Sequence, residues 1–365
     1  MSRSASSSQF KVKLSTVRGY DVQKEEGCLG VVGHRKFYNL GDVFVKRTLR
    51  PPEYRVRPWS GFVVEAGWQK NDHIRNEAAC IRFIRENTDI PVPKVVCTFE
   101  DDESVYLITE IVPGVCMADL PEEKRLVVEK ELWKHQRTMW SLRSNKIGGP
   151  SGIVILPGRV HDFREEYKDR PEGFNDMLKA EFKDMQYRTS DKDDFVFCHN
   201  DYAQQNILVD PDTLKITGIL DWEYAGFFPR WFDRPWYKRF GGANPMGYER
   251  CDKDRIFSFL RTWSVNYTGE PSENSSSLNE EPLRVYRYTA EENARILKEY
   301  KEELAQEAAR AGQQAEAVAE QELAVGREDS GGAAQEHNAN HEGVAGTESD
   351  EVVVGLVKDL LLSTN

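Results

Sequence analysis

Several signals that would direct a protein to a membrane or a secretory pathway are missing from this sequence. No apolar run reaches the roughly 18 residues that a membrane-spanning helix needs. The N-terminus MSRSASSSQF has no apolar segment like that of a secretory signal, so we expect a cytoplasmic protein with no membrane contact. The six cysteines form no CxxC pair and have no histidines at zinc-site spacing, which favours reduced thiols.

An excess of basic charge is also absent. The net charge is -12, and residues 301–365 hold 14 Asp and Glu against 4 Lys and Arg, which leaves 47 acidic and 45 basic residues before them. A nearly neutral body predicts neither a nucleic-acid-binding face nor a membrane-binding one. The charged fraction of 30% and the mean hydropathy of -0.63 indicate that part of the chain is not packed.

The first third of the chain alternates strand patterns with one helix pattern. Residues 43–45 read as a strand that ends at Lys46 and begins at a Gly41-Asp42 turn. Residues 71–87 place apolar side chains at helical spacing, and either of the first two residues, an asparagine and an aspartate, can cap that helix. Two more strands are predicted over residues 95–99 and 105–109. These elements form a compact β-rich N-terminal lobe.

Between the strand at residues 43–45 and the helix at 71–87, residues 50–70 read as a loop or extended insertion. The rest of the chain reads as mostly helical. Helices are predicted over 122–142 and 171–189, and the run 195–198 (FVFC) is a short buried strand. The expected division is a poorly ordered N-terminus 1–28, an N-terminal nucleotide-binding lobe 29–112, a catalytic and acceptor-binding lobe 113–288, a charged helical extension 289–325 and a mostly disordered acidic tail 326–365.

A group of polar residues surrounds the strand 195–198 and the hairpin that follows it. The strand leads directly to His199 and Asp201. Strands predicted over 207–209 and 214–220 form a hairpin, whose outer ends place Asn206 beside Asp221, about 5 Å apart at the Cα atoms. An amide oxygen and a carboxylate held together suit Mg²⁺. Asp201 would lie next to that metal, where it can accept a hydroxyl proton, although an ordinary loop and strand is the alternative interpretation.

These motifs resemble the aminoglycoside phosphotransferase/choline kinase family. HNDYAQQNILVD is similar to that family's HGDLxxxNILVD, and GILDWEYAGFFP is similar to its IDWExAGxxP. Further matches are VFVKR, NEAACIRFIREN followed by IPVPKV, and LITEIVPG, so the resemblance covers residues 30–265. It implies an α+β, two-lobed protein-kinase-like fold with a small β-rich N-terminal lobe and a larger, mostly helical C-terminal lobe, followed by the helical or disordered acidic tail.

The resemblance also implies an activity and assigns roles. The chain would transfer the γ-phosphoryl group of ATP to a hydroxyl group of a small molecule, with Mg²⁺ as cofactor. Asp201 would be the catalytic base and His199 would brace its loop, while Asn206 and Asp221 would hold the metal.

On the nucleotide side, the resemblance assigns Lys46 to the α- and β-phosphates and pairs it with Glu77. A surface lysine and a solvated helical glutamate are the alternatives for these two residues. The linker from Glu110 to Val112 would meet the adenine through its backbone groups.

Two departures from the family pattern stand out. The first glycines of the chain do not spell GxGxxG, so no glycine-rich phosphate loop can be named. Asn200 and Tyr202 flank Asp201, where the family usually has Gly and Leu, and the bulkier Asn200 could shift the loop.

Two other functions fit parts of the sequence. A protein kinase is disfavoured because Asp221 is not followed by an Asp-Phe-Gly motif or an activation segment. A kinase-like scaffold that has lost catalysis is disfavoured because the base and both metal ligands are present, although the acidic tail would suit a protein contact. The acceptor site is expected in the helical lobe, near carboxylates such as Glu223 and Asp233 and near an aromatic run that can equally be core: Trp222, Tyr224, Phe227, Phe228, Trp231, Phe232 and Trp236.

Overall fold

The computed structural model describes residues 27–32, 34–56, 63–64, 67–161, 171–269, 278, 280–289, 291–296, 298–299 and 302. Residues 1–26 of the predicted N-terminal segment 1–28 and the acidic tail 326–365, with its proposed protein contact, lie outside these residues. Of the charged helical extension, residues 291–296 are helical. None of the described helices is long and apolar enough to cross a membrane. All six cysteines are free thiols.

A five-stranded antiparallel sheet forms the N-terminal part of the fold, in the order β1-β2-β3-β7-β6. The strands predicted from residues 43, 95 and 105 are confirmed, and each runs longer than expected. Two strands were not predicted, and the first of them begins at Cys28, which had been assigned to the poorly ordered N-terminus. The bounds are β1 Cys28–Val32, β2 Arg35–Asn39, β3 Val43–Thr48, β6 Val95–Asp101 and β7 Ser104–Glu110.

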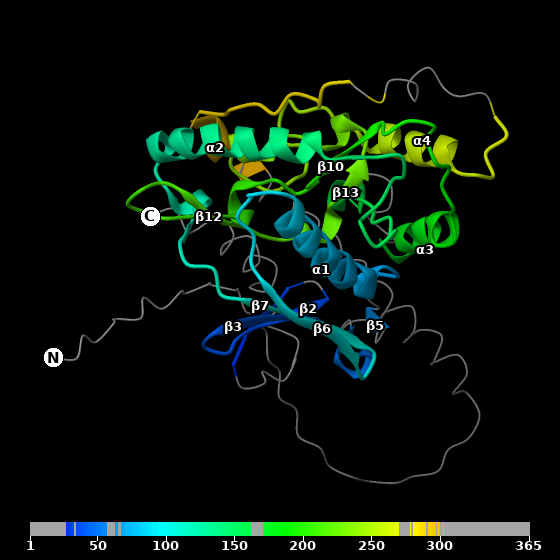
Figure 1. Cartoon of the computed structure of the whole chain (residues 1–365), viewed down its shortest axis with the longest axis horizontal. Helices are drawn as coiled ribbons and strands as arrows, with labels where there is room; N and C mark the ends of the chain where they lie inside the picture. Colours follow the sequence, from blue (N-terminus) through cyan, green and yellow to red (C-terminus); the bar gives the residue numbers. More distant parts are fainter. Residues whose placement is uncertain are drawn as a thin grey trace, which may run out of the picture.

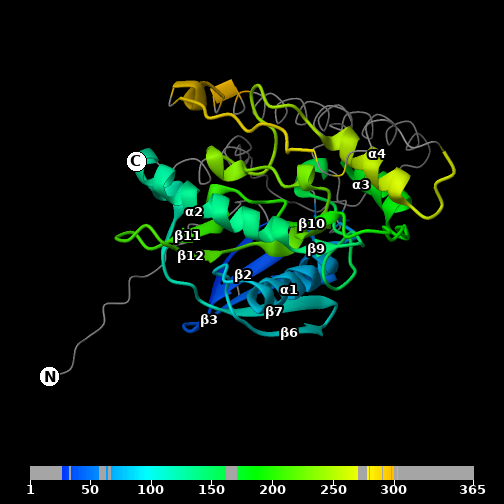
Figure 2. The same cartoon turned by 45° about the horizontal axis from the view of Figure 1, so that its top comes forward.

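Helix α1, Lys70–Asn87, lies between this sheet and the rest of the molecule (Figures 1 and 2). Its apolar positions, Ile74, Ala78, Ile81 and Ile84, are all buried, as the helical spacing predicts. The predicted capping is wrong, because the helix begins after Gln69 and no side chain caps it. The asparagine expected to cap it instead accepts a hydrogen bond from Thr48 on β3.

The predicted insertion between β3 and α1 contains little regular structure among its described residues. It has a 3-10 turn at Pro51–Glu53 and a pair of two-residue strands, β4 Arg55–Val56 and β5 Val63–Val64. The turn packs its glutamate against the sheet: Glu53 accepts hydrogen bonds from Lys36 and Arg47, at 2.6 and 2.7 Å.

The larger part of the fold contains three helices, α2 Glu122–Ser141, α3 Pro171–Phe182 and α4 Lys253–Trp263 (Figure 1). Helix α3 ends seven residues before the predicted bound, and α4 was not predicted. This part is less helical than expected, because it also holds two three-stranded sheets, β13-β10-β9 and β12-β11-β8. Their bounds are β8 Val115–Cys116, β9 Arg143–Ser144, β10 Phe195–Cys198, β11 Ile207–Val209, β12 Ile216–Ile219 and β13 Gly226–Phe228.

Strand β10 has the predicted bounds, and its position explains why the next residues are held firmly. All four of its residues are buried, and it is the middle strand of its sheet. Phe197 packs against Trp222 and Phe227 in the same core. A fully buried strand therefore fixes the point at which the chain leaves the sheet at His199.

Candidate active site

The loop after β10 holds Asp201 at the boundary between the core and solvent. Asn206 binds it twice, because its amide nitrogen donates to the Asp201 backbone oxygen and to the carboxylate Oδ2, both at 2.9 Å. Burial raises the pKa of Asp201 well above its usual value, and the nearby carboxylate of Asp221 raises it further. The structure thus brings together Asp201 and its two predicted neighbours.

Asn200, the first departure from the family pattern, has a conformational explanation. Its φ of 64° lies in the left-handed region, which glycine enters freely and asparagine tolerates better than most residues. Its side-chain nitrogen donates to the backbone oxygen of Tyr224 at 2.8 Å. Tyr202, the second departure, is buried and its hydroxyl donates to the backbone oxygen of Leu132 at 3.2 Å. Both larger residues are therefore accommodated without disrupting the loop.

His199 is buried between the Asp201 loop and the hairpin. Its Nδ1 accepts the backbone N–H of Asp201 at 3.3 Å, so its Nε2 carries the proton and donates to the backbone oxygen of Leu220 at 3.1 Å. Burial lowers the pKa of His199 to about 4, which keeps the ring neutral. These contacts join the Asp201 loop to the end of β12.

Asp233 is a second anchor of this loop, and the prediction that it might face the acceptor is wrong. Its side chain is fully buried. Oδ1 accepts the backbone N–H groups of His199 and Asn200 at 3.0 and 3.3 Å. Oδ2 accepts hydrogen bonds from the side chains of Gln136 and Trp140 at 3.0 and 2.9 Å. All four hydrogen bonds are to buried groups of the protein, so the Asp233 side chain holds the loop in place from its buried side.

The predicted hairpin exists, but its pairing differs by one residue from the expected one. Strands β11 and β12 pair Ile207 with Ile219, so Asn206 lies opposite Leu220, whose N–H donates to the backbone oxygen of Asn206 at 2.8 Å. Asp221 follows one residue later, with a left-handed backbone (φ 63°). The reversal of direction there turns its carboxylate toward Lys46 instead of directly toward Asn206.

Lys46 joins the two parts of the fold at this point. Its Nζ lies 2.8 Å from Glu77 Oε2 on α1 and 2.6 Å from Asp221 Oδ1 after β12. Burial alone would lower the pKa of Lys46, but the surrounding carboxylates outweigh it and raise the pKa. Burial raises the pKa of Glu77 to about 7 in spite of the lysine. The predicted Lys46–Glu77 pair is present in the structure, and neither residue is on the surface.

Glu223, one of the carboxylates expected to suit a cationic acceptor, belongs to this cluster. Its Oε2 lies 3.4 Å from Lys46 Nζ and 2.6 Å from Nη2 of Arg35, the first residue of β2. Burial would raise the pKa of Glu223, but Arg35 and Lys46 together lower it. Arg35 was not among the predicted site residues because β2 was not predicted. The alternation of that strand around Phe37 would have placed the arginine on one face with it.

The donor set fits a divalent cation. One oxygen of each of Glu77, Asp221 and Glu223 lies within 4.8 Å of the others, and Asp201 adds a fourth carboxylate nearby. These four acids outnumber the two cations, Lys46 and Arg35, so an additional positive charge would be favourable there. The amide nitrogen of Asn206 is engaged by Asp201, which leaves its oxygen as the atom that could face a cation. Oxygen donors with excess negative charge are the chemistry that Mg²⁺ prefers.

The linker between the two parts begins at the end of β7. The backbone N–H of Glu110 donates to the Lys94 oxygen at 3.0 Å, so of its two backbone groups only the carbonyl could face a nucleotide. Val112 lies over Gly218 of β12, where a Cβ on that glycine would come within 2.7 Å of the valine side chain. The linker is therefore packed against the hairpin that leads to Asp221.

The aromatic run after Asp221 is core. Of its seven members only Tyr224 is partly exposed, and the others are buried. Stacked and edge-to-face contacts join several of them, such as Phe228 with Phe232 at 4.9 Å. These rings support the loop and leave no face of their own for an acceptor.

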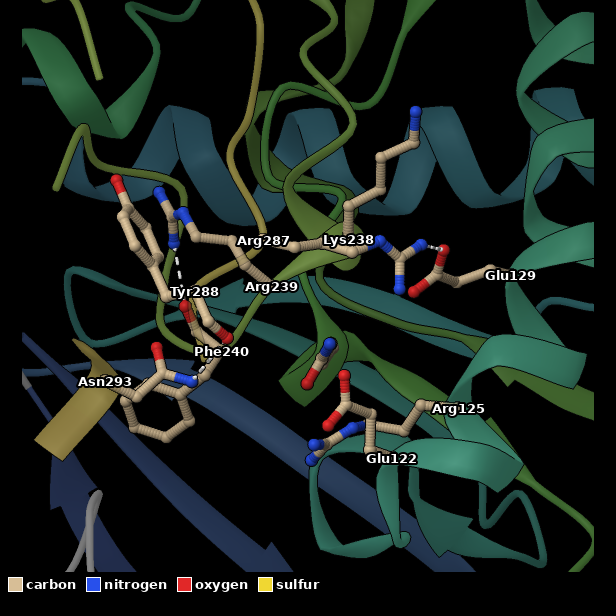
Figure 3. Close-up of a pocket in the computed structure, with 10 residues that line it drawn as sticks. Glu122, Arg125, Glu129, Lys238, Arg239, Phe240, Arg287, Tyr288 and Asn293 are labelled. Atoms are coloured by element: carbon tan, nitrogen blue, oxygen red, sulfur yellow. Dashed lines mark hydrogen bonds and ion pairs between the residues drawn. The ribbon is translucent and has the colours of Figure 1, made fainter. Parts of the chain in front are cut away.

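A cavity of about 40 Å³ opens beside the Asp201 loop, between the start of α2 and the segments around Lys238 and Tyr288 (Figure 3). Gln204, three residues after Asp201, lines it. Its Oε1 is buried and has no hydrogen-bond partner among the described residues. Charged side chains from α2 form one wall, and Figure 3 shows Arg287 reaching Glu129 across the cavity.

Comparisons with known proteins agree with the motifs. Residues 63–234 match the phosphotransferase enzyme family. The chain is 30% identical over 157 residues to an aminoglycoside 3'-phosphotransferase of Streptomyces ribosidificus, an alignment that spans 41% of this chain and 58% of that protein. It is 28% identical over 247 residues to an aminoglycoside 3'-phosphotransferase of Streptomyces fradiae, covering 60% and 90% of the two chains.

Two solved structures are also similar. One is an aminoglycoside-3'-phosphotransferase of type VIII, with 20% identity, a TM-score of 0.35 and coverage of 70% of this chain and 92% of that one. The other is an aminoglycoside phosphotransferase from Streptomyces rimosus in complex with ADP and streptomycin, with 15% identity, a TM-score of 0.34 and coverage of 55% and 72%.

Proposed function

We propose that the protein transfers the γ-phosphoryl group of ATP to a hydroxyl group of a small molecule, as the match of residues 63–234 to the phosphotransferase enzyme family supports. The observation that carries the proposal is the meeting of Lys46, Glu77 and Asp221 within 2.8 Å contacts beside the Asp201–Asn206 pair. A phosphate-holding cation, a cation-binding carboxylate and a base in one place are the parts that phosphoryl transfer requires.

Under this proposal the fold has the two lobes of a protein kinase. The sheet β1-β2-β3-β7-β6 with α1 is the nucleotide-binding lobe, and the part that follows Val112 is the catalytic and acceptor-binding lobe. The adenine would lie at the linker, against the carbonyl of Glu110 and the backbone of Val112. The partly exposed rings of Phe37 and Phe44, 6.1 Å apart, share the face of Lys46 and would cover the base.

The residues of the site then have distinct tasks. Asp201 would accept the proton of the acceptor hydroxyl. The hydroxyl oxygen would then bond to the γ-phosphorus as the bond from that phosphorus to ADP breaks. Lys46 would hold the α- and β-phosphates, with Glu77 fixing its position. Asp221 and the oxygen of Asn206 would hold Mg²⁺, which supplies positive charge to the phosphate oxygens. His199 and Asp233 would keep the loop in place.

A bound cation would also favour the ionised form of Asp201, the form that can act as a base. The pKa of Asp201 is raised by burial and by Asp221. A cation held by Asp221 would cancel the second cause and lower that pKa, so the base would be ionised when the nucleotide is in place.

For the acceptor, the cavity of Figure 3 is a candidate contact because Gln204, three residues after Asp201, lines it; with about 40 Å³ it could take one polar group of the acceptor and not a whole sugar. The unpartnered Gln204 oxygen would accept a hydrogen bond from a hydroxyl or amino group. Lys238 and Arg125 also line this cavity and are further hydrogen-bond donors there. A screen of hydroxyl compounds, aminoglycosides among them, with ATP consumption and product mass as readouts, would identify the acceptor.

Replacement of Asp221 tests the proposal. Asp221→Ala should abolish turnover instead of only raising KM, because the phosphoryl transfer depends on the charge that this carboxylate positions. Asp212→Ala, in the exposed turn of the same hairpin, is the matched control and should keep wild-type activity. A retained kcat in Asp221→Ala would place the metal site elsewhere.

A further inference from the structure

Arg35 lies on the same face of the sheet as Lys46. Strands β2 and β3 pair Phe37 with Lys46 and Arg35 with Thr48. Directly opposed residues of antiparallel strands point to the same face, and residues two apart on one strand do so as well. Arg35, Phe37 and Lys46 therefore face the site together, and the Arg35 side chain is only 21% exposed.

The order of the side chains along this face matches the direction of a bound nucleotide. The end of the sheet nearest the linker is where Val43 of β3 pairs with Glu110 of β7. Asn39 of β2 lies near that end, beside Phe44, and Arg35 lies at the other end of β2, beside Thr48. At about 3.4 Å per residue, the four steps from Asn39 to Arg35 span roughly 13 Å. If the adenine lies at the linker, as the proposed function requires, Lys46 comes at the middle and Arg35 beyond it.

The chain also needs a group to hold the outer phosphates. Its sequence lacks the GxGxxG loop whose backbone N–H groups would cover them. Arg35 begins the second strand of the hairpin where such a loop would lie. A guanidinium group binds phosphate oxygens with two parallel hydrogen bonds, which an ammonium group cannot do.

We propose that Arg35 binds the terminal phosphates of the nucleotide, exchanging its ion pair with Glu223 for the phosphate oxygens when the nucleotide enters. The inference rests on the proposed function, because it takes the position of the nucleotide from it. The competing role for Arg35 is purely structural: the 2.6 Å ion pair with Glu223 ties β2 to the segment after β12. The two roles differ in whether the effect of Arg35 depends on the number of phosphates.

The experiment compares the binding of ATP, ADP and AMP, each with Mg²⁺, to the full chain by calorimetry. The quantity of interest is the ratio of the AMP and ATP dissociation constants. Arg35→Gln should lower this ratio by about 10- to 100-fold, the usual effect of losing a charge-assisted hydrogen-bond pair, while the Kd of AMP stays within about twofold. Arg50→Gln, which removes a surface arginine paired with Asp102, is the control and should leave the ratio unchanged.

A second variant guards against a loss of folding, since Arg35→Gln leaves Glu223 with less compensation. Arg35→Lys keeps the positive charge but lacks the two-pronged geometry, and it should lower the ratio at least about threefold. An unchanged ratio in either variant overturns the proposal, as does an equal weakening of ATP and AMP.

The result also separates this proposal from the proposed function. A wild-type protein that prefers ATP and loses that preference in the Arg35 variants, yet transfers no phosphate, contradicts the proposed function alone. A wild-type protein with no preference for ATP over AMP overturns the Arg35 proposal.

Discussion

Asp233→Asn should destabilise the protein by about 3 kcal/mol, although it changes only one oxygen into an NH₂ group. The carboxylate accepts four hydrogen bonds in a fully buried position, two on each oxygen. Whichever oxygen becomes NH₂, two N–H donors lose their acceptor and face another donor. Each unpaired buried donor costs about 1–3 kcal/mol, and relief of the buried charge offsets part of the sum.

Urea unfolding of wild-type and variant proteins, followed by tryptophan fluorescence, measures this difference. Asp212→Asn is the matched control, because Asp212 is an exposed aspartate in the turn between β11 and β12. This control should change the free energy of unfolding by less than about 0.5 kcal/mol. Asp233→Asn should also lose activity, since the Asp233 side chain positions His199 and Asn200. A free energy of unfolding within about 0.5 kcal/mol of wild type would refute the assigned anchoring role.

Two further predictions concern the fold on either side of the site. His199 has a pKa of about 4 in the folded protein and about 6.5 in the unfolded chain, so the unfolded chain binds the proton first as the pH falls. The neutral histidine therefore contributes up to about 3 kcal/mol to the free energy of unfolding above pH 6.5, and this contribution is lost as the pH falls toward 4. Urea unfolding at several pH values should show this loss, and His199→Gln should lack that component; equal pH dependence in both proteins would contradict it. Glu53→Gln should cost about 2 kcal/mol, because buried Arg47 loses its charged partner. ATP binding should be unaffected, since Arg47 faces away from Lys46, and a calorimetric titration beside the urea measurement checks both parts.

Local patterns in the sequence were enough to predict several elements of the fold. The apolar spacing of α1 and the four-residue apolar run of β10 each reflect burial that is decided within the element. The hairpin of β11 and β12 was predicted because a turn rich in Asp and Pro separates two apolar runs. The signal for α4 was also present, since Ile256, Phe257 and Leu260 follow helical spacing and are all buried.

Other features depend on contacts between distant segments and could not be predicted from the sequence. Asp233 reaches the N–H groups of residues more than 30 positions earlier, and no local pattern links them. Strand β2 carries a basic residue on each face, and its alternation is visible only once Glu223 and Glu53 are known to pair with Arg35 and Lys36. The register of the hairpin places Asn206 one position away from the expected pairing with Asp221, and the apolar runs of the two strands do not specify that register. The types of side chain in the site were therefore predictable, and their partners were only partly so.

The central claim is that Asp201 is the base of a phosphoryl transfer. The measurement that tests it most directly is turnover of Mg-ATP with the acceptor found by the screen, in wild type, Asp201→Asn and the control Asp212→Asn. We expect Asp201→Asn to lower kcat by about 100- to 10,000-fold, while the dissociation constant of ATP changes less than about threefold. Equal kcat values in the wild type and Asp201→Asn would contradict the account.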